Sequence, residues 1–129
     1  MEELWEDIHL GPLCVEHINR ILGYNLKAAN VTFFGHAQKH AFEEKPHRHP
    51  ICKPHYGDLV SAPTHIGQQE KYVGKAFELI KQCDNGGPIV LIGIGISLAK
   101  GGVYTIHTAY PINTNTLGRR LRIGTVWPV

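Results

Sequence analysis

The sequence predicts an α+β fold in which helices come first and an antiparallel sheet follows. Two observations support this. Apolar residues recur at helical spacing near the N-terminus, and the run IVLIGIGISL (89–98) has the branched, alternating composition of a strand between two turn-rich segments. The length of 129 residues is enough for one domain with its own core. We therefore expect a single domain over residues 1–129, with helices packed on one face of a sheet of three or more strands.

In the first third of the chain we expect mainly helices. The apolar pattern of residues 1–23 is largely helical, and Gly23 is suited to end the second of two helical segments. The β-branched and aromatic residues 31–34 predict a short buried strand. Residues 36–45 are mostly helix formers, and the proline that follows them ends the helix.

The middle of the chain alternates predicted loops with short elements. Three prolines in residues 46–54 predict a loop, residues 56–62 favour a short helix, and residues 63–71 read as a second loop. Residues 76–82 fit a strand and a helix almost equally well by periodicity. The segment DNGGP (84–88) is typical of a turn.

The last third predicts a hairpin. In residues 89–98 the branched side chains alternate, which places them on the core face and puts Gly93 and Gly95 on the other face. Glycines there indicate a bend, a bulge or the close approach of another group. Residues 103–112 return antiparallel to this strand. The remaining chain predicts a turn and a basic segment (113–122), followed by a short final strand (123–129).

The composition is that of an ordinary globular protein, with 43% hydrophobic and 19% charged residues. No apolar run approaches the ~20 residues of a membrane span, and the acidic N-terminus lacks the apolar region of a secretory signal. Three cysteines, an odd and sparse set, indicate free thiols in a reducing compartment. The net charge of +2 does not by itself predict a nucleic-acid-binding protein.

Histidine is the unusual component, with nine residues. On the predicted helix 36–45, His36 and His40 are four residues apart and Lys39 lies between them, so two imidazoles and an ammonium group share one surface. In the strand 103–112, simple alternation places Thr108 and Tyr110 on one side and His107 on the other, unless the strand carries a bulge. A cleft between this helix and this strand would gather polar groups.

This combination of groups suits the cleavage of RNA by its own 2′-hydroxyl. One group must accept the 2′-OH proton, a second must protonate the leaving 5′-oxygen, and a cation must stabilise the charge on the phosphorane. Histidine suits both proton transfers, and lysine or arginine suits the third task. The reaction requires no metal and no other cofactor, and its product is a 2′,3′-cyclic phosphate.

Four segments carry a resemblance to BECR-type nucleases, the superfamily named after barnase, EndoU, colicin nucleases and RelE. They are GHAQKHAFEEKP, EKYVGKAFELIK, IVLIGIGIS and GGVYTIHTAYPI, within residues 31–124. The likeness is greatest to toxin and prophage-encoded members. The resemblance implies N-terminal helices packed on an antiparallel sheet of about four to five strands. It also implies a cytoplasmic endoribonuclease toxin that cleaves tRNA or mRNA without a metal, has no membrane partner, and is neutralised by a cognate antitoxin or immunity protein.

Position by position, the resemblance implies a set of site residues. The helix motif matches the two histidines and the lysine, the late strand supplies a threonine and a tyrosine, and one arginine matches a basic residue after that strand. The implied set is His36, Lys39, His40, Thr108, Tyr110 and Arg120.

Two other functions remain open from the residues alone. The first is a non-catalytic module on the same fold that binds RNA or protein. The second is a small zinc-binding protein, because the loop His47-x-His49-x-x-Cys52-x-x-His55 has ligand types that suit zinc, although its spacing matches no known zinc pattern.

Overall fold

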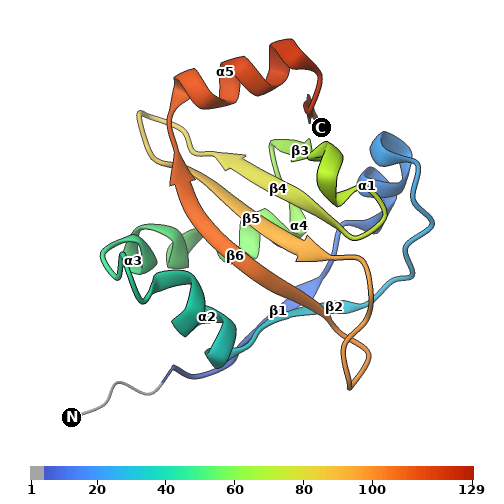
Figure 1. The fold of residues 1–129 in the computed structure, drawn as a ribbon, viewed down its shortest axis with the longest axis vertical. Coiled ribbons are helices and arrows are strands. Elements are labelled where there is room, and N and C mark those ends of the chain that lie inside the picture. The colour runs from blue at the N-terminus through green and yellow to red at the C-terminus, as the bar shows by residue number, and fades with distance from the viewer. Residues whose placement is uncertain (1–4) are drawn as a thin grey trace.

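We describe a computed structural model of the chain, which defines residues 5–129. Within these residues, seven strands form one sheet in the order β1-β2-β6-β5-β4-β3-β7 (Figure 1). The strands are β1 (Ile8–Pro12), β2 (Asn30–Phe33), β3 (His65–Gly67), β4 (Ala76–Gln82), β5 (Ile89–Gly95), β6 (Tyr104–Ile112) and β7 (Val126–Pro128). The helices are α1 (Val15–Leu22), α2 (Gly35–Phe42), α3 (Arg48–Cys52), α4 (Tyr56–Ser61) and α5 (Thr114–Ile123), with the 3-10 turns η1 (Lys53–His55) and η2 (Glu70–Tyr72).

The predicted α+β class is confirmed, but the predicted arrangement is partly wrong. The sheet is larger than four to five strands, and it is mixed because β2 runs parallel to β6. The other pairings are antiparallel. The helices are distributed along the chain and are not confined to its N-terminal part. Between residues 5 and 129, no helix is both long and apolar enough to cross a membrane.

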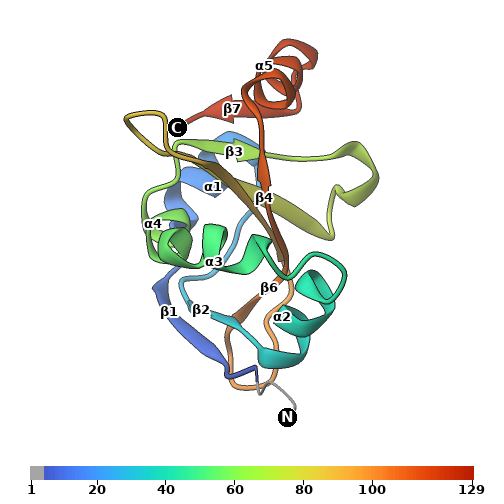
Figure 2. The ribbon, with the colours of Figure 1, turned by 90° about the vertical axis from the view of Figure 1, so that its left-hand side faces the viewer.

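The main hydrophobic core fills one face of the sheet. Figure 2 shows α1 and α4 on this side, and α4 contributes Leu59 and Val60 to the core. From the sheet, Val90, Ile92 and Ile94 of β5 point into it, as the alternation predicts, and each is fully buried. Burial of these branched side chains contributes about 1.5–3 kcal/mol each, which fixes the register of β5.

A second, smaller core lies on the opposite face under α5. Leu117 of α5 packs there with Ile80 of β4 and Leu91 of β5, together with Val126 of β7. Asn113 begins α5, because its side-chain oxygen accepts a hydrogen bond from the Thr116 amide at 2.8 Å. Figure 1 shows this helix across one end of the sheet.

The N-terminal prediction is partly wrong. Residues 8–12 were expected to be helical but form β1, which pairs with β2 at the edge of the sheet, while residues 1–4 lie outside the described part. The second predicted helix is present as α1, and Gly23 ends it with a φ of 75°. Pairing with β2 provides hydrogen-bond partners for the backbone N–H and C=O groups of β1. The local apolar pattern gives no sign of this pairing, because β2 lies later in the chain.

The proline-rich segment 46–54 is also different from the prediction. It forms α3 and η1, because Pro50 lies in the first turn of α3 and Pro54 in the first turn of η1, where a missing N–H costs no helical hydrogen bond. The predicted loop 63–71 contains β3 and η2, and the predicted turn and basic segment 113–122 is α5. The predictions for α2, α4, the β5–β6 hairpin and β7 are confirmed, with β5 ending at Gly95. Residues 76–82, which fit a strand and a helix almost equally well by periodicity, form β4.

Candidate functional site

A cleft of about 420 Å³ opens on the second face of the sheet, beside the small core under α5. We call it the sheet-face cleft. Strands β4, β5 and β6 form its floor, and the segment around η2 forms one wall. Its lining residues are Gln69, Lys71, Tyr72, Ala76, Phe77, Glu78, Gly93, His107, Thr108 and Tyr110.

A β-bulge in β6 brings two polar side chains into this cleft together. Gly93 pairs with Thr108 and Ile94 pairs with Ile106, so His107 is the extra residue between two register positions. His107 and Thr108 therefore both face the cleft, while Ile106 faces the main core. Simple alternation, which separates His107 from Thr108, therefore does not apply here, and the exception that the sequence analysis allowed for, a bulge in this strand, is present.

Two glycines of β5 make room for these side chains. A Cβ placed on Gly93 would lie 2.9 Å from Cγ2 of Thr108, and one placed on Gly95 would lie 2.6 Å from Nε2 of His107. Both distances are too short for a side chain to be accommodated without movement. The alternating glycines thus allow the two β6 side chains to lie over the neighbouring strand, which is the close approach that the sequence indicated.

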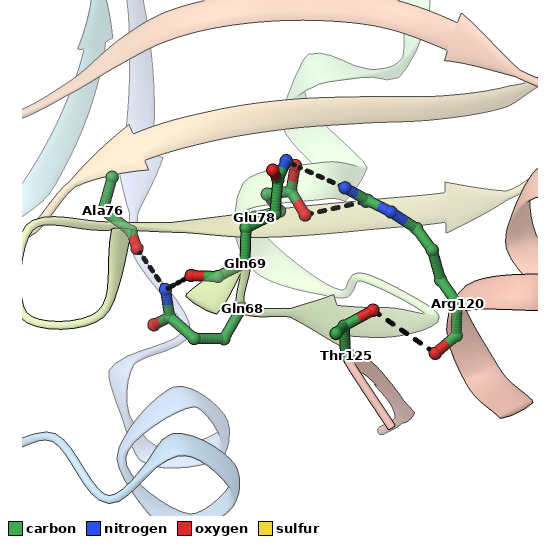
Figure 3. A network of polar contacts seen from close by, with 6 residues as sticks. All are labelled: Gln68, Gln69, Ala76, Glu78, Arg120 and Thr125. Carbon is green, nitrogen blue, oxygen red and sulfur yellow. Dashed lines mark hydrogen bonds and ion pairs between the residues drawn. The ribbon is translucent and has the colours of Figure 1, made fainter. Parts of the chain in front are cut away.

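A buried ion pair lies at the other side of the cleft floor. Arg120 of α5 donates to both carboxylate oxygens of Glu78, at 2.8 and 3.4 Å, and the Gln69 amide donates to Glu78 Oε2 at 2.9 Å (Figure 3). The two charged side chains are only 13% and 10% exposed. Because two donors hold the carboxylate, its position in the cleft is fixed.

Tyr110 is a hydrogen-bond donor in the same cleft. Burial raises the pKa of its phenol, and the nearby Glu78 carboxylate raises it further, while Arg120 and Arg48 act in the opposite direction. The net shift is upward, so the phenol stays protonated at neutral pH. Tyr110 therefore offers an O–H group to an anion bound in the cleft.

The wall of the cleft at η2 is held by a tyrosine from a distant part of the chain. The Tyr24 hydroxyl donates to Gln68 Oε1 at 2.5 Å and accepts from the Gly74 amide at 2.9 Å. The Gln68 amide group donates to the carbonyl oxygen of Ala76 at 2.8 Å (Figure 3). These bonds tie both ends of the segment 68–76, which carries Lys71 and Tyr72, to the body of the protein.

The predicted helix motif lies outside the sheet-face cleft. His36, Lys39 and His40 are all exposed on α2, where His36 stacks on Phe34 with ring centroids 5.8 Å apart. His40 lies 3.9 Å from a carboxylate oxygen of Glu43. It also lines a separate hollow of about 320 Å³ between α2 and α3, with Ala41, Glu43, Glu44, Lys45 and Arg48.

The structure therefore gathers only part of the predicted site. Thr108 and Tyr110 line the cleft, and Arg120 bonds to Glu78 at its floor. The residues that sequence reasoning missed are Glu78, Lys71 and His107. The glycine alternation in β5 was the available signal for His107, because it implied a close approach from the paired strand.

The candidate ligands of the histidine-rich segment 47–55 lie apart from one another. Cys52 is fully buried in the main core, His55 Nδ1 lies 3.4 Å from the Cys83 sulfur, and His49 packs edge-on against Phe42. These side chains are used in different places, and within the described residues no group of three or more His, Cys, Asp or Glu side chains is arranged to hold a metal ion.

Comparison of the chain with known protein families, curated proteins and solved structures finds no match. The site is therefore interpreted from its own geometry. An imidazole, a fixed carboxylate, a phenol, a hydroxyl and an ammonium group surround a hollow with a glycine at its floor. That set can transfer protons to and from a bound phosphodiester and can donate hydrogen bonds to its oxygens.

Proposed function

We propose that the protein is a metal-independent endoribonuclease of the BECR type and that the sheet-face cleft is its active site. The observation that supports this most directly is the placement of His107 and Glu78 in one cleft whose floor is Gly93. The two groups can share the two proton transfers that RNA cleavage requires. The order of the sequence segments that resemble BECR nucleases supports the same proposal.

The register of the strands leaves space for a phosphodiester. Gly93 pairs with Glu78 on one side and with Thr108 on the other. Neighbouring strands are about 4.8 Å apart, so the backbones of Glu78 and Thr108 are separated by roughly 10 Å. Because Gly93 has no side chain, the Thr108 side chain lies over it, and in this proposal the phosphate group binds next to Thr108, in the cleft that Glu78 and His107 also line.

In the proposed step, the 2′-oxygen of the RNA attacks the adjacent phosphorus while Glu78 accepts the 2′-OH proton. The bond between phosphorus and O2′ forms, and the bond between phosphorus and O5′ breaks. His107, in its protonated form, gives its proton to O5′. The products are a 2′,3′-cyclic phosphate and a 5′-hydroxyl, and exchange of protons with water restores both side chains.

Three other residues hold the phosphate in this proposal. Lys71, at the rim, places positive charge near the phosphorane, whose charge increases in the transition state. Thr108 and the protonated phenol of Tyr110 donate hydrogen bonds to the non-bridging oxygens. Arg120 acts indirectly, because its guanidinium group is engaged with Glu78 and orients that carboxylate.

The α2 residues offer an alternative location for the same chemistry. Two observations favour them. His40 and Arg48 line the same hollow, and the positive charge of Arg48 acts on the Tyr110 phenol by lowering its pKa. This alternative predicts that the loss of His40, and not of His107, abolishes cleavage. It has less support, because His36 and Lys39 are not among the residues that line either hollow.

Cytoplasmic action and an inhibitory partner are parts of the same proposal. The cysteines of the described chain are free thiols, as expected in a reducing compartment. A nuclease active there would damage the RNA of the cell that makes it, so we propose that a cognate antitoxin or immunity protein blocks the sheet-face cleft.

The proposal is tested by incubating the purified protein with RNA in EDTA and analysing the fragment ends. We expect fragments with 2′,3′-cyclic phosphate ends, no cleavage of a 2′-deoxy strand of the same sequence, and little cleavage by His107→Ala. Cleavage of the 2′-deoxy strand would contradict the proposed reaction. If RNA binds tightly but stays intact, the chain is a binding module and not a nuclease.

A further inference from the structure

An exposed aromatic ring stands at the mouth of the sheet-face cleft. Tyr72, at the end of η2, lines the cleft and is 42% exposed. The ammonium group of Lys71 lies 5.0 Å from the centre of its ring. Among residues 5–129, no other aromatic ring is in stacking or edge contact with Tyr72. The ring therefore has a cation near it and, within the part of the chain that the structure describes, no aromatic partner.

The backbone that carries this ring is fixed by hydrogen bonds. The Tyr72 amide donates to the carbonyl of Gln69 at 3.0 Å, and the Tyr72 carbonyl accepts from the Lys75 amide at 2.8 Å. The hydroxyl of Tyr24 ties down Gln68 and Gly74 on either side. An exposed aromatic side chain on a segment fixed at both ends loses little further backbone freedom when a ligand binds.

We propose that Tyr72 is a stacking platform for one unpaired nucleobase next to the scissile phosphate, so that the substrate of the cleft is single-stranded RNA. This inference rests on the proposed nuclease function. Bases stack on aromatic side chains whatever their identity, and a nearby cation holds the adjacent backbone phosphate. Tyr72 and Lys71 supply these two groups from consecutive positions.

The shape of the site favours a single strand over a duplex. The cleft volume of about 420 Å³ is within the range of small-ligand pockets and is lined near Tyr72 by Ala76 and Phe77. In a duplex every base is paired and stacked on its neighbours, so none is free to meet the tyrosine ring. Because Tyr72, Glu78 and His107 line the same cleft, an unpaired nucleotide with its base on Tyr72 has its phosphate near the proposed proton-transfer groups.

The inference is tested by binding, with a fully 2′-O-methylated RNA hexamer that lacks the attacking hydroxyl and cannot be cleaved. We expect Tyr72→Ala to weaken binding by about 10- to 100-fold, corresponding to the loss of one stacked base. Tyr72→Phe keeps the ring and should bind within about twofold of the wild type, because stacking needs only the ring. Val73→Ala is the matched control, since Val73 is 61% exposed on the same segment but does not line the cleft.

Abasic substitution identifies the stacked base. Removing the base that stacks on Tyr72 should weaken binding of the hexamer to the wild type by the same factor as the Tyr72→Ala substitution does. The same abasic hexamer should bind the Tyr72→Ala protein as tightly as the intact hexamer binds that protein. Equal abasic penalties in both proteins at every position would overturn the platform, as would a 2′-O-methylated duplex that binds as tightly as the single strand.

These measurements separate the inference from the function on which it rests. If the effects of Tyr72→Ala and of the abasic position on binding are coupled, that is non-additive, while unmodified RNA is not cleaved, the platform stands and the nuclease proposal fails. If RNA is cleaved but the coupling is absent, the nuclease proposal stands and the platform fails.

Discussion

Gly95 of β5 lies directly beneath the imidazole of His107 in β6. A Cβ on Gly95 would be 2.6 Å from Nε2 of His107, a distance that real Cβ contacts do not reach. The imidazole is able to lie there because the β6 bulge turns His107 to this face and because Gly95 has no side chain. The hydroxyl of Thr105, 3.3 Å from the same nitrogen, orients the ring. The position of the proposed acid thus depends on a glycine in another strand.

The first prediction concerns Gly95→Ala. The added methyl group must displace the His107 ring, and because that ring is the exposed end of a flexible side chain, we expect the free energy of unfolding to change by less than about 1 kcal/mol. Moving a proton-transfer group by about 1 Å should lower the cleavage rate by roughly 100-fold. Urea unfolding and single-turnover cleavage measure the two effects.

The control for this variant is Gly11→Ala, which makes the same change in β1. No atom lies within 4 Å of a Cβ placed on Gly11, so both stability and cleavage should stay near the wild-type values. If Gly95→Ala cleaves RNA as fast as Gly11→Ala does, the position of His107 is not important for the reaction.

The second prediction concerns the buried pair of Arg120 and Glu78. Arg120→Ala leaves the Glu78 carboxylate buried without its cation, and we expect it to destabilise the protein by about 3 kcal/mol. Arg119→Ala, on the exposed side of the same helix, should change the free energy of unfolding by less than about 0.5 kcal/mol. Chemical denaturation of the two variants makes the comparison, and equal stabilities would mean that the pair contributes nothing.

The third prediction concerns Tyr24→Phe, which removes the hydroxyl that bridges Gln68 and Gly74. We expect a loss of about 1 kcal/mol and faster hydrogen exchange of the Gly74 amide. Tyr104→Phe is a matched control, because its hydroxyl donates to the Lys27 carbonyl, away from this segment. Faster exchange at Gly74 in both variants, or in neither, would show that Tyr24 does not hold the cleft wall.

The fourth prediction concerns alkaline pH. Burial raises the pKa of the Cys52 thiol from 9.0 to about 11, with Arg48 opposing the shift. Between these values the unfolded chain releases the thiol proton and the folded chain keeps it. The free energy of unfolding should therefore fall with rising pH, by up to about 1.4 kcal/mol per pH unit from this group.

Cys52→Ala tests the assignment of this pH dependence. The variant should be less stable overall, because it leaves a cavity in the main core. Its stability should nevertheless fall less steeply between pH 9 and 11, while Cys14, whose pKa is also raised to about 11, keeps its own contribution. If the free energy of unfolding changes equally with pH in the variant and the wild type, Cys52 does not contribute to the pH dependence.

The elements that the sequence predicts correctly are those stabilised by local or neighbouring segments. The β5–β6 hairpin follows from alternation and a turn, and α2 follows from helix formers that end near a proline. Strand β1 depends on its pairing with β2, which the local sequence does not reveal. The helical form of residues 48–55 depends on Pro50 and Pro54 falling in first turns, and the number of prolines alone does not show where they fall.

The site was less predictable than the fold for a similar reason. Glu78 and Arg120 are 42 positions apart, so nothing in their local sequence indicates that they bond. His107 enters the cleft through a single extra residue in β6, which shifts the face of everything after it. Thr108 and Tyr110 were predicted as site residues and do line the cleft, but without the predicted helix residues His36, Lys39 and His40.

The most direct test of the central claim compares two histidine variants. Single-turnover cleavage of a defined single-stranded RNA is measured in EDTA for the wild type, His107→Ala and His40→Ala. We predict that His107→Ala loses at least about 100-fold in rate, as expected for loss of a proton-transfer group, and that His40→Ala stays close to the wild type. If His40→Ala loses activity and His107→Ala keeps it, the chemistry takes place on α2 and the sheet-face cleft is not the active site.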